Sequence, residues 1–314
     1  MLESIAQLRQ ALDGSSLSSQ DIARVPPVPG NDKIVFAIDV NGIDAMEAWR
    51  LLRSLIDITG RWPLLTMMHT HRADSWERQV GEADLFSRFY FAEEQRNDRL
   101  SDSPADIIAA AAGINVAAQL ARFPADASLE LIDALETARQ ETLLQYGTAP
   151  AIDDPAVFLT GESISTLKQL ERWFLQWEIE NCIEPLGLPE QGLTHIDWYK
   201  PQYESHALLL MPSLRGWEAP AYLNWFASYL CNSQFIVALL REWHEQYGAE
   251  LVAHYGTMLQ FMVSRRPATI EQAFELAWQQ HTVSPCTLIL PGVSMRNHAR
   301  ALLHTDRWFL HERP

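Results

Sequence analysis

The chain has few cysteines, and their spacing excludes two kinds of small stabilised domain. Three occur among 314 residues, at Cys182, Cys231 and Cys286, and none belongs to a Cys-x-x-Cys pair. An odd number of widely separated thiols is not typical of a disulfide framework or of a zinc knuckle. The sequence therefore predicts a protein of a reducing compartment, and we expect a cytoplasmic location.

Long apolar runs are also missing. No stretch approaches the roughly 18 uninterrupted apolar residues of a membrane span. Residues 1–10 carry Glu3 and lack an apolar core of signal-peptide length. We therefore expect neither a membrane-embedded protein nor one secreted by the usual route.

Basic side chains are scarce relative to acidic ones. The chain has 24 Lys and Arg against 40 Asp and Glu, a formal net charge of −16. A surface of this sign repels the phosphate backbone of nucleic acids and attracts cationic partners over long range. The sequence predicts no direct nucleic-acid binding, and it favours a basic protein as partner.

Motifs that hold nucleotides or activate nucleophiles are absent in their usual forms. No Gly-x-Gly-x-x-Gly follows a strand, and no Gly-x-x-x-x-Gly-Lys-Ser/Thr occurs, so no nucleotide cofactor is predicted, nor any other cofactor. The stretch 161–165 resembles a nucleophile elbow but lacks the second glycine. Adjacent carboxylates such as Asp153 and Asp154 indicate solvated faces. No catalytic group is predicted.

The composition is that of a folded protein, with 47% apolar and 20% charged residues. Its length suits two domains. Short apolar runs alternate with amphipathic stretches, which predicts a mixed α/β fold of two αβ modules, residues 1–150 and 151–314, joined by a helical middle segment. Residues 1–30 contain a short helical pattern and Ser- and Pro-rich stretches, so we expect a peripheral arm.

The two modules share an order of elements. The pattern in the first module predicts strand 33–39 and helix 46–56, which Gly60 ends. It then predicts strands 62–68 and 85–91 and a helix that begins with a capping box at Ser103. The second predicts strand 206–211, helix 233–247 ended by Gly248, strands 249–255 and 258–263, and a helix opened by Thr269. Aligning the two glycines also aligns residues 51–53 with 239–241. This suggests an internal duplication, although any amphipathic helix closed by glycine before a strand would give the same match.

The middle segment predicts two helices, residues 128–146 and 163–182. The second places Trp173 and Trp177 one turn apart on a single face. We expect both indoles to pack in a core, because most tryptophan side chains are largely buried.

One group of residues could bind a metal. His69 and His71 follow a strand and are close in sequence to Asp74, and two histidines at a strand end can both reach one ion. Such a site would need further ligands, which no second cluster supplies. A pair of solvated loop histidines is the alternative. The remaining histidines of the C-terminal segment have no ligand spacing.

From Glu218 to Phe309 the sequence resembles a bacterial family catalogued as a domain of unknown function, number 4253. The residues that carry the resemblance are Pro220, Leu223, Trp225, Leu240–Trp243, Tyr247–Val252, Arg266–Thr269, Glu271–Ala273, Gln280, His281, Trp308 and Phe309. The chain departs from the family at Ser284-Pro285-Cys286 and at Phe309-Leu310-His311.

The resemblance implies structural roles and suggests a function. Gly248 is expected to stop a helix, Thr269 to cap one, and Trp243 and Trp308 to pack in the core. Proteins similar to this family are sometimes encoded near toxin genes, which implies an immunity or antitoxin role. The chain would then neutralise a basic bacterial toxin, for example a secreted nuclease effector.

Candidate residues for contacting such a partner are those in loops expected to be exposed, namely Trp76, Glu77, Glu93 and Glu94. Two other functions remain open from the sequence. One is a metal-dependent hydrolase that uses His69, His71 and Asp74, and the other is a scaffold that senses a small ligand.

Overall fold

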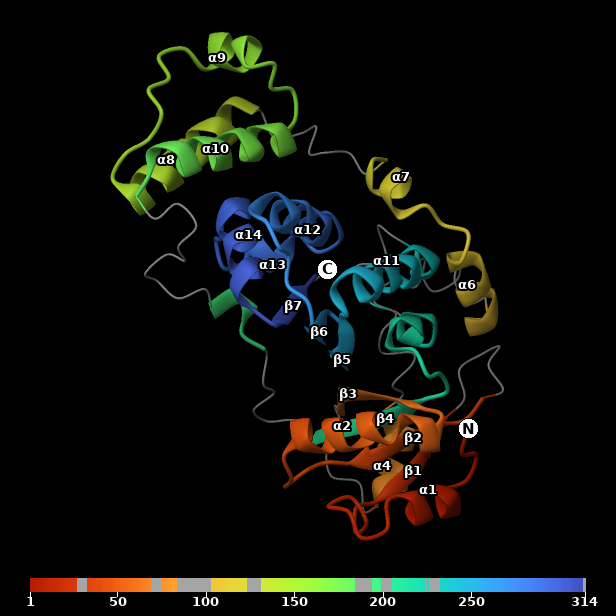
Figure 1. Ribbon diagram of the computed structural model, residues 1–314. Helices are drawn as coiled ribbons and strands as arrows, with labels where there is room; N and C mark the ends of the chain where they lie inside the picture. The colour runs from red at the N-terminus through yellow and green to blue at the C-terminus, as the bar shows by residue number, and fades with distance from the viewer. Residues whose placement is uncertain are drawn as a thin grey trace. The chain divides into compact units, whose positions relative to one another are not determined.

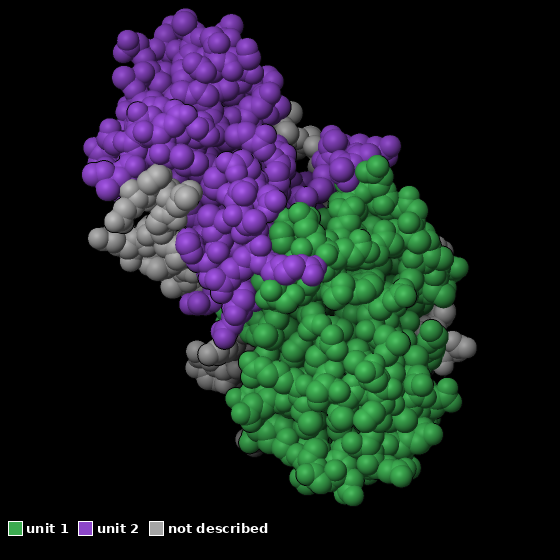
Figure 2. Space-filling model, viewed as in Figure 1, with its two compact units in different colours: residues 1–116, 198–264, 309–314 green, residues 117–197, 265–308 purple. Residues whose placement is uncertain are grey.

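The structure is a computed structural model and describes residues 1–26, 33–68, 75–83, 103–122, 131–183, 194–198, 205–223, 225 and 232–312. These residues divide into two compact units (Figure 2). Unit 1 contains residues 1–116, 198–264 and 309–314, and unit 2 contains residues 117–197 and 265–308. Both units are discontinuous in sequence, so neither coincides with the expected modules 1–150 and 151–314. The expected boundary near residue 150 falls inside unit 2.

The fold is mixed α/β, as predicted. Within the described ranges, seven strands form one sheet in the order β1-β2-β4-β3-β5-β6-β7 (Figure 1). Strands β3 and β5 pair in parallel, whereas the pairs β1–β2, β2–β4, β3–β4 and β5–β6 are antiparallel. Both expected modules therefore contribute strands to the same sheet. The strands are β1 (Ile22–Val25), β2 (Val35–Asp39), β3 (Trp62–Met68), β4 (Ser205–Met211), β5 (Glu250–His254), β6 (Met258–Met262) and β7 (Arg307–His311).

The core of unit 1 lies along the middle of this sheet. Every residue of β3 is buried, and the residues from Ala207 to Met211 in β4 are fully buried. Leu64 of β3 is paired with Leu209 of β4, and Leu65 faces Ala253 of β5. Continuous apolar strands are expected where a sheet is covered on both faces.

The expectation of a peripheral N-terminal arm is wrong. Strand β1 pairs with β2, with Ile22 opposite Ile38. Leu8 of helix α1 (Ile5–Ala11) is completely buried, and so are Leu12 and Leu17 after the helix. Arg61 holds this region through two backbone oxygens, since its guanidinium donates to Leu2 O at 2.8 Å and to Ile34 O at 2.5 Å. The Ser-rich stretch 15–19 thus connects α1 to β1, two elements of the core.

Unit 1 also contains helices that pack on the sheet and on one another. They are α2 (Ala45–Ser54), α3 (Ile56–Thr59), α4 (Trp76–Glu82), α6 (Pro104–Ala111), the 3₁₀ helix η2 (Gly216–Ala221) and α11 (Ser233–Tyr247). The indole of Trp49 in α2 donates to Pro63 O of β3 at 3.0 Å. Helix α6 begins with the predicted capping box between Ser103 and Asp106.

Gly60 and Gly248 stop helices as predicted. Their φ angles are +68° and +61°, the left-handed conformation that glycine adopts without a steric penalty. Each is followed by a strand, and these strands, β3 and β5, are parallel neighbours in the sheet. The local match extends to backbone conformation, but it does not confirm a duplication.

Unit 2 is helical. Its helices are α7 (Val116–Leu120), whose first residue belongs to unit 1, α8 (Leu131–Tyr146), α9 (Pro155–Gly161), α10 (Leu167–Asn181), the 3₁₀ helix η1 (Thr194–Ile196), α12 (Ile270–Val283), α13 (Cys286–Ile289) and α14 (Met295–His304). Within the part of the chain that the structure describes, no helix is both long and apolar enough to cross a membrane.

Helices α8, α9 and α10 share a hydrophobic core of their own, built from Leu135, Ala138, Leu159, Ile164, Leu170 and Phe174. Helix α9 was not predicted. The Asp-Pro sequence at its start is typical of a linker. In the structure, Asp154 caps the helix by accepting hydrogen bonds from two backbone N–H groups, and Pro155 occupies its first turn. Trp173 packs at the margin of this core, at 4.8 Å from Phe158 between ring centroids.

We predict that Gly248→Ala lowers the free energy of unfolding by at least about 1–2 kcal/mol, because an alanine at positive φ is strained. Its Cβ would also crowd Ser264 Oγ. The control is Gly161→Ala, where φ is not positive and a Cβ meets nothing within 4 Å. We expect that change to be neutral or to stabilise by about 0.4–1 kcal/mol. Urea denaturation measures both, and equal effects would contradict the left-handed assignment.

Candidate partner-binding site

Two arginines of α14 are buried, at positions 296 and 300. Their side chains are 1% and 0% exposed, and they lie one turn apart on the same face of the helix. A guanidinium without a partner in a dry interior loses hydration that nothing replaces. Carboxylates must therefore accompany them.

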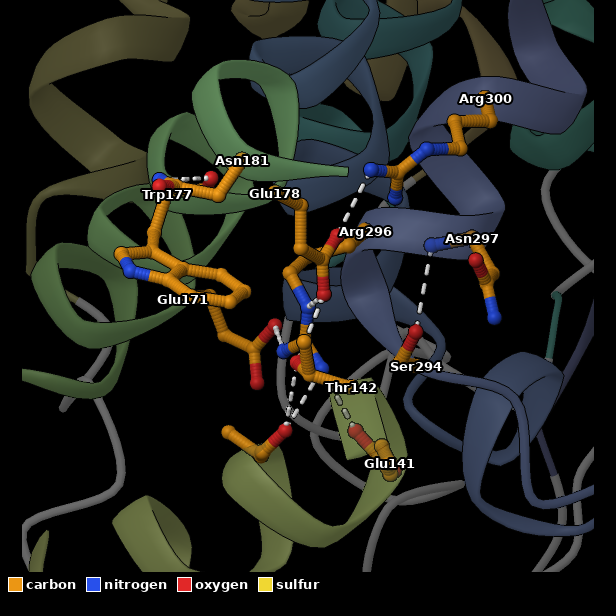
Figure 3. A network of polar contacts seen from close by, with 11 residues as sticks. Glu141, Thr142, Glu171, Trp177, Glu178, Asn181, Ser294, Arg296, Asn297 and Arg300 are labelled. Carbon is orange, nitrogen blue, oxygen red and sulfur yellow. Dashed lines mark hydrogen bonds and ion pairs between the residues drawn. The ribbon is translucent and has the colours of Figure 1, made fainter. Parts of the chain in front are cut away.

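Those carboxylates come from α8 and α10 (Figure 3). Arg296 binds Glu171 at 2.5 Å, Glu178 at 2.8 Å and Glu141 at 3.0 Å through three different nitrogens. Arg300 binds the second oxygen of Glu178 at 2.6 Å. We call these five residues the ionic network. It joins three helices that are far apart in sequence.

Arg296 keeps its charge. Burial acts to lower the pKa of Arg296, but the carboxylates of Glu171, Glu178 and Glu141 outweigh it and raise that pKa above its ordinary value. Burial raises the pKa of Glu141, and Arg296 opposes this shift. Thr142 adds a hydroxyl that lies 2.8 Å from Glu178 Oε1. Three carboxylates thus surround two cations in fixed geometry.

Further ion pairs connect α10 to α12. Lys168 binds Glu275 at 2.7 Å, and Arg172 contacts the other oxygen of the same carboxylate. Both cations also lie near aromatic rings, Lys168 near Trp278 and Arg172 near Phe274. Helix α10 is therefore held to α12 and α14 by charged side chains.

The outer surface of this helical region is acidic. Residues 131–183 contain nine acidic and three basic side chains, and three of the nine carboxylates belong to the ionic network, which leaves six others. Among these residues, all of them described, Arg172 is the one exposed cation, and it already pairs with Glu275. The exposed carboxylates are Asp133, Glu136, Asp153, Asp154, Glu162 and Glu180.

The predicted contact residues differ in their exposure to solvent. Trp76 was expected to be exposed, but it is 7% exposed and its indole donates to Ala37 O at 3.0 Å, because helix α4 packs against the sheet. Glu77 lies exposed in the first turn of that helix. Glu93 and Glu94 lie outside the described residues, so their binding role stays a prediction.

The predicted metal site, His69, His71 and Asp74, also lies outside the described residues. Elsewhere, in the ranges that are described, no three His, Cys, Asp or Glu residues are placed to hold a metal ion. The hydrolase alternative therefore stays a prediction from the sequence.

A second buried polar group lies on another face of α14. His298 Nε2 is 2.8 Å from Gln280 Oε1 of α12, and His298 Nδ1 is 2.9 Å from His195 Nε2 of η1. With Gln280 Oε1 as acceptor, the proton is on His298 Nε2, and His195 Nε2 donates to His298 Nδ1. This chain of hydrogen bonds holds η1 against α12 and α14.

Two helical stripes in the sequence are weak signals of the ionic network. Glu171, Phe174 and Glu178 follow one helical stripe, so the two carboxylates share a face with a core aromatic residue. On α14, the arginines likewise share a stripe. A carboxylate or arginine on an apolar stripe indicates a buried ion pair, but it does not identify the partner.

A family model, domain of unknown function (DUF4253), matches residues 207–311, the C-terminal third of the chain. The resemblance found in the sequence is thereby confirmed. The structural roles that the resemblance implied for these residues are also as expected. Thr269 caps α12, and Trp243 and Trp308 are each 1% exposed. No curated protein and no solved structure matches the chain. The family segment includes Arg296 and Arg300 but none of their carboxylate partners.

We predict that Arg296→Met lowers the free energy of unfolding by about 3–5 kcal/mol, because it leaves buried carboxylates without their counter-ion. The control is Arg172→Met, which removes an arginine that is 56% exposed and should cost less than about 1 kcal/mol. Urea denaturation followed by circular dichroism measures both. Equal losses would show that the ionic network contributes no more than a surface pair.

The buried histidines predict a loss of stability in acid. Burial lowers the pKa of His195 from 6.5 to about 4, and it lowers that of His298 well below 6.5. The unfolded chain therefore takes up protons first, so the stability that these groups provide is complete above pH 6.5 and is lost as the pH falls toward 4.

We expect the double variant His195→Leu/His298→Leu to lose less stability than the wild type between about pH 7 and pH 4.5, by on the order of 3 kcal/mol. The exposed His304→Leu variant should retain the wild-type dependence. Urea denaturation at a series of pH values measures the difference. An unchanged slope in the double variant would contradict burial of these imidazoles.

Proposed function

We propose that this protein is a non-enzymatic binding protein that neutralises a basic bacterial toxin, in the manner of an immunity protein. The observation that carries the proposal is the acidic outer surface of residues 131–183, with six exposed carboxylates and one exposed cation that is already paired. A basic enzyme presents the complementary charge, for example in a cleft that binds nucleic acid.

Complementary charge acts mainly on the rate of association and on the choice of partner. Carboxylates on one protein steer a cationic protein toward them, and like-charged proteins are rejected. Binding of this kind weakens as salt screens the charges. The ionic network supports the proposal, because it fixes α8 and α10 and so keeps their outer carboxylates in a defined arrangement.

The family model and the cysteines are compatible with this function. The family carries no assigned activity. We propose a cytoplasmic location in a bacterium, where the protein would protect the cell that makes the toxin. The three cysteines show no spacing typical of extracellular disulfide proteins.

The test is titration of the full chain with the purified product of the adjacent gene, at about 150 mM and about 500 mM salt. We expect a complex that weakens at the higher salt and that blocks the toxin's enzymatic activity. Asp133→Asn/Glu136→Gln should weaken binding about 3- to 10-fold, since each exposed charge contributes modestly. The control, Asp13→Asn/Asp57→Asn, changes the net charge equally in unit 1 and should leave binding unaltered.

Absence of a complex at physiological salt would refute the proposed function. Binding with no dependence on salt would remove its electrostatic basis. Isothermal titration calorimetry gives the affinity, and an assay of the partner's activity shows whether the complex is neutralising.

A further inference from the structure

The hydrogen-bonded imidazoles of His195 and His298, which we call the histidine pair, are buried without a counter-ion. Their side chains are 6% and 1% exposed, and Gln280, which accepts from the pair, is completely buried. Burial is the main cause that lowers the pKa of each imidazole, and no carboxylate of the described residues contributes to either shift. The buried arginines of α14, by contrast, are surrounded by carboxylates. The pair is therefore held in its neutral form.

Charged neighbours also oppose a proton on the histidine pair. After burial, the causes that lower the pKa of His298 are His195 and His281 of α12, because each would place a second positive charge nearby. The two arginines on the same helix are bound in the ionic network. Asp197, which follows η1, is exposed. The described surroundings thus favour neutral imidazoles from α12, α14 and η1 alike.

The hydrogen bonds of the pair admit one added proton but not two. His298 Nε2 donates to Gln280 Oε1 at 2.8 Å, and His298 Nδ1 accepts from His195 Nε2 at 2.9 Å. A first proton on His195 Nδ1 leaves both bonds in place. A second proton must bind His298 Nδ1, which converts the acceptor into a donor and brings two cations face to face. Full protonation of the pair is therefore incompatible with the contact.

The element that this contact holds is short. Helix η1 has three residues, and a single helical turn has little stability of its own. It belongs to the stretch of chain between α10 and β4. Of the side chains described at positions 195–197, His195 is buried, Ile196 is half-buried and Asp197 is exposed. Segments with few buried contacts open locally while the rest of the protein stays folded.

We propose that η1 is an acid-sensitive latch, which stays closed on α12 and α14 while the histidine pair is neutral and opens when both imidazoles are protonated. Opening places His195 in water and leaves His298 Nδ1 free to bind a proton. Each imidazole then regains a pKa near its ordinary value of 6.5, so opening takes up two protons below that pH. The closed contact is therefore favoured above about pH 6.5 and weakens as the pH falls.

Proton linkage gives the size of the effect. One imidazole that is neutral in the closed state and titrates normally in the open state raises the opening equilibrium about 25-fold between about pH 7 and about pH 5. Two such imidazoles raise it about 600-fold. The closed state begins to take up protons only near the pKa of His195, about 4, so the latch responds between pH 6.5 and about 4.

Hydrogen exchange of the full chain, followed by mass spectrometry, tests the latch. The opening equilibrium of residues 194–198 is obtained from amide exchange after correction for its intrinsic dependence on pH. For the wild type we expect an increase of at least about 100-fold from about pH 7 to about pH 5. His195→Gln retains a donor for His298 Nδ1 but does not titrate, and it should show an increase of about 25-fold or less.

The control is His304→Gln, which removes an exposed imidazole and should leave the wild-type dependence unchanged. Circular dichroism verifies that both variants are folded. A larger dependence on pH in the wild type than in His195→Gln, with slower exchange in α12, supports the latch. Equal dependence in these two proteins overturns it, as does wild-type opening that pH does not change. Exchange of residues 194–198 only at the rate of the α12 amides also overturns it, because opening would then require global unfolding.

Discussion

The arrangement of unit 2 depends on the ion pairs that Arg296 and Arg300 make with Glu171 and Glu178. Each of these four side chains is at most 12% exposed. In such surroundings, a charge left alone costs several kcal/mol, and the attraction of the pair offsets this cost only when the geometry is good. Apolar contacts tolerate sliding between helices, whereas these contacts have fixed partners and directions. They therefore set the register of α10 on α14.

Helix α8 carries carboxylates in two different surroundings. Glu141 of α8 faces the arginines, while Asp133 and Glu136 of that helix face water. The three carboxylates of the ionic network are largely offset by its two arginines, so they contribute little to the long-range field. The carboxylates outside have few cations beside them. The negative potential at the outer surface thus originates mainly from carboxylates that lie outside the ionic network.

Local patterns in the sequence predicted the elements well and their assembly poorly. Strand Trp62–Met68, helix Ser233–Tyr247 and the cap at Ser103 follow from short-range periodicity and capping chemistry, and all three are confirmed. The common sheet depends on pairing between β3 and β4, whose partners are distant in sequence, and no local signal encodes it. The acidic character of residues 131–183 is visible in the sequence. The cations that pair with its buried carboxylates could not be identified from the sequence, because they lie on α14, more than 100 positions away.

The separation along the chain between Glu178 and Arg296 has a consequence for how the protein is made. The two residues are 118 positions apart. At about 5–20 residues per second, a ribosome completes α10 roughly 6–24 s before it has made α14. During that interval the helical region carries its interior carboxylates hydrated and without counter-ions. The native arrangement of unit 2 is therefore reached only after α14 has been made, and the nascent α8–α10 region must remain unaggregated until then.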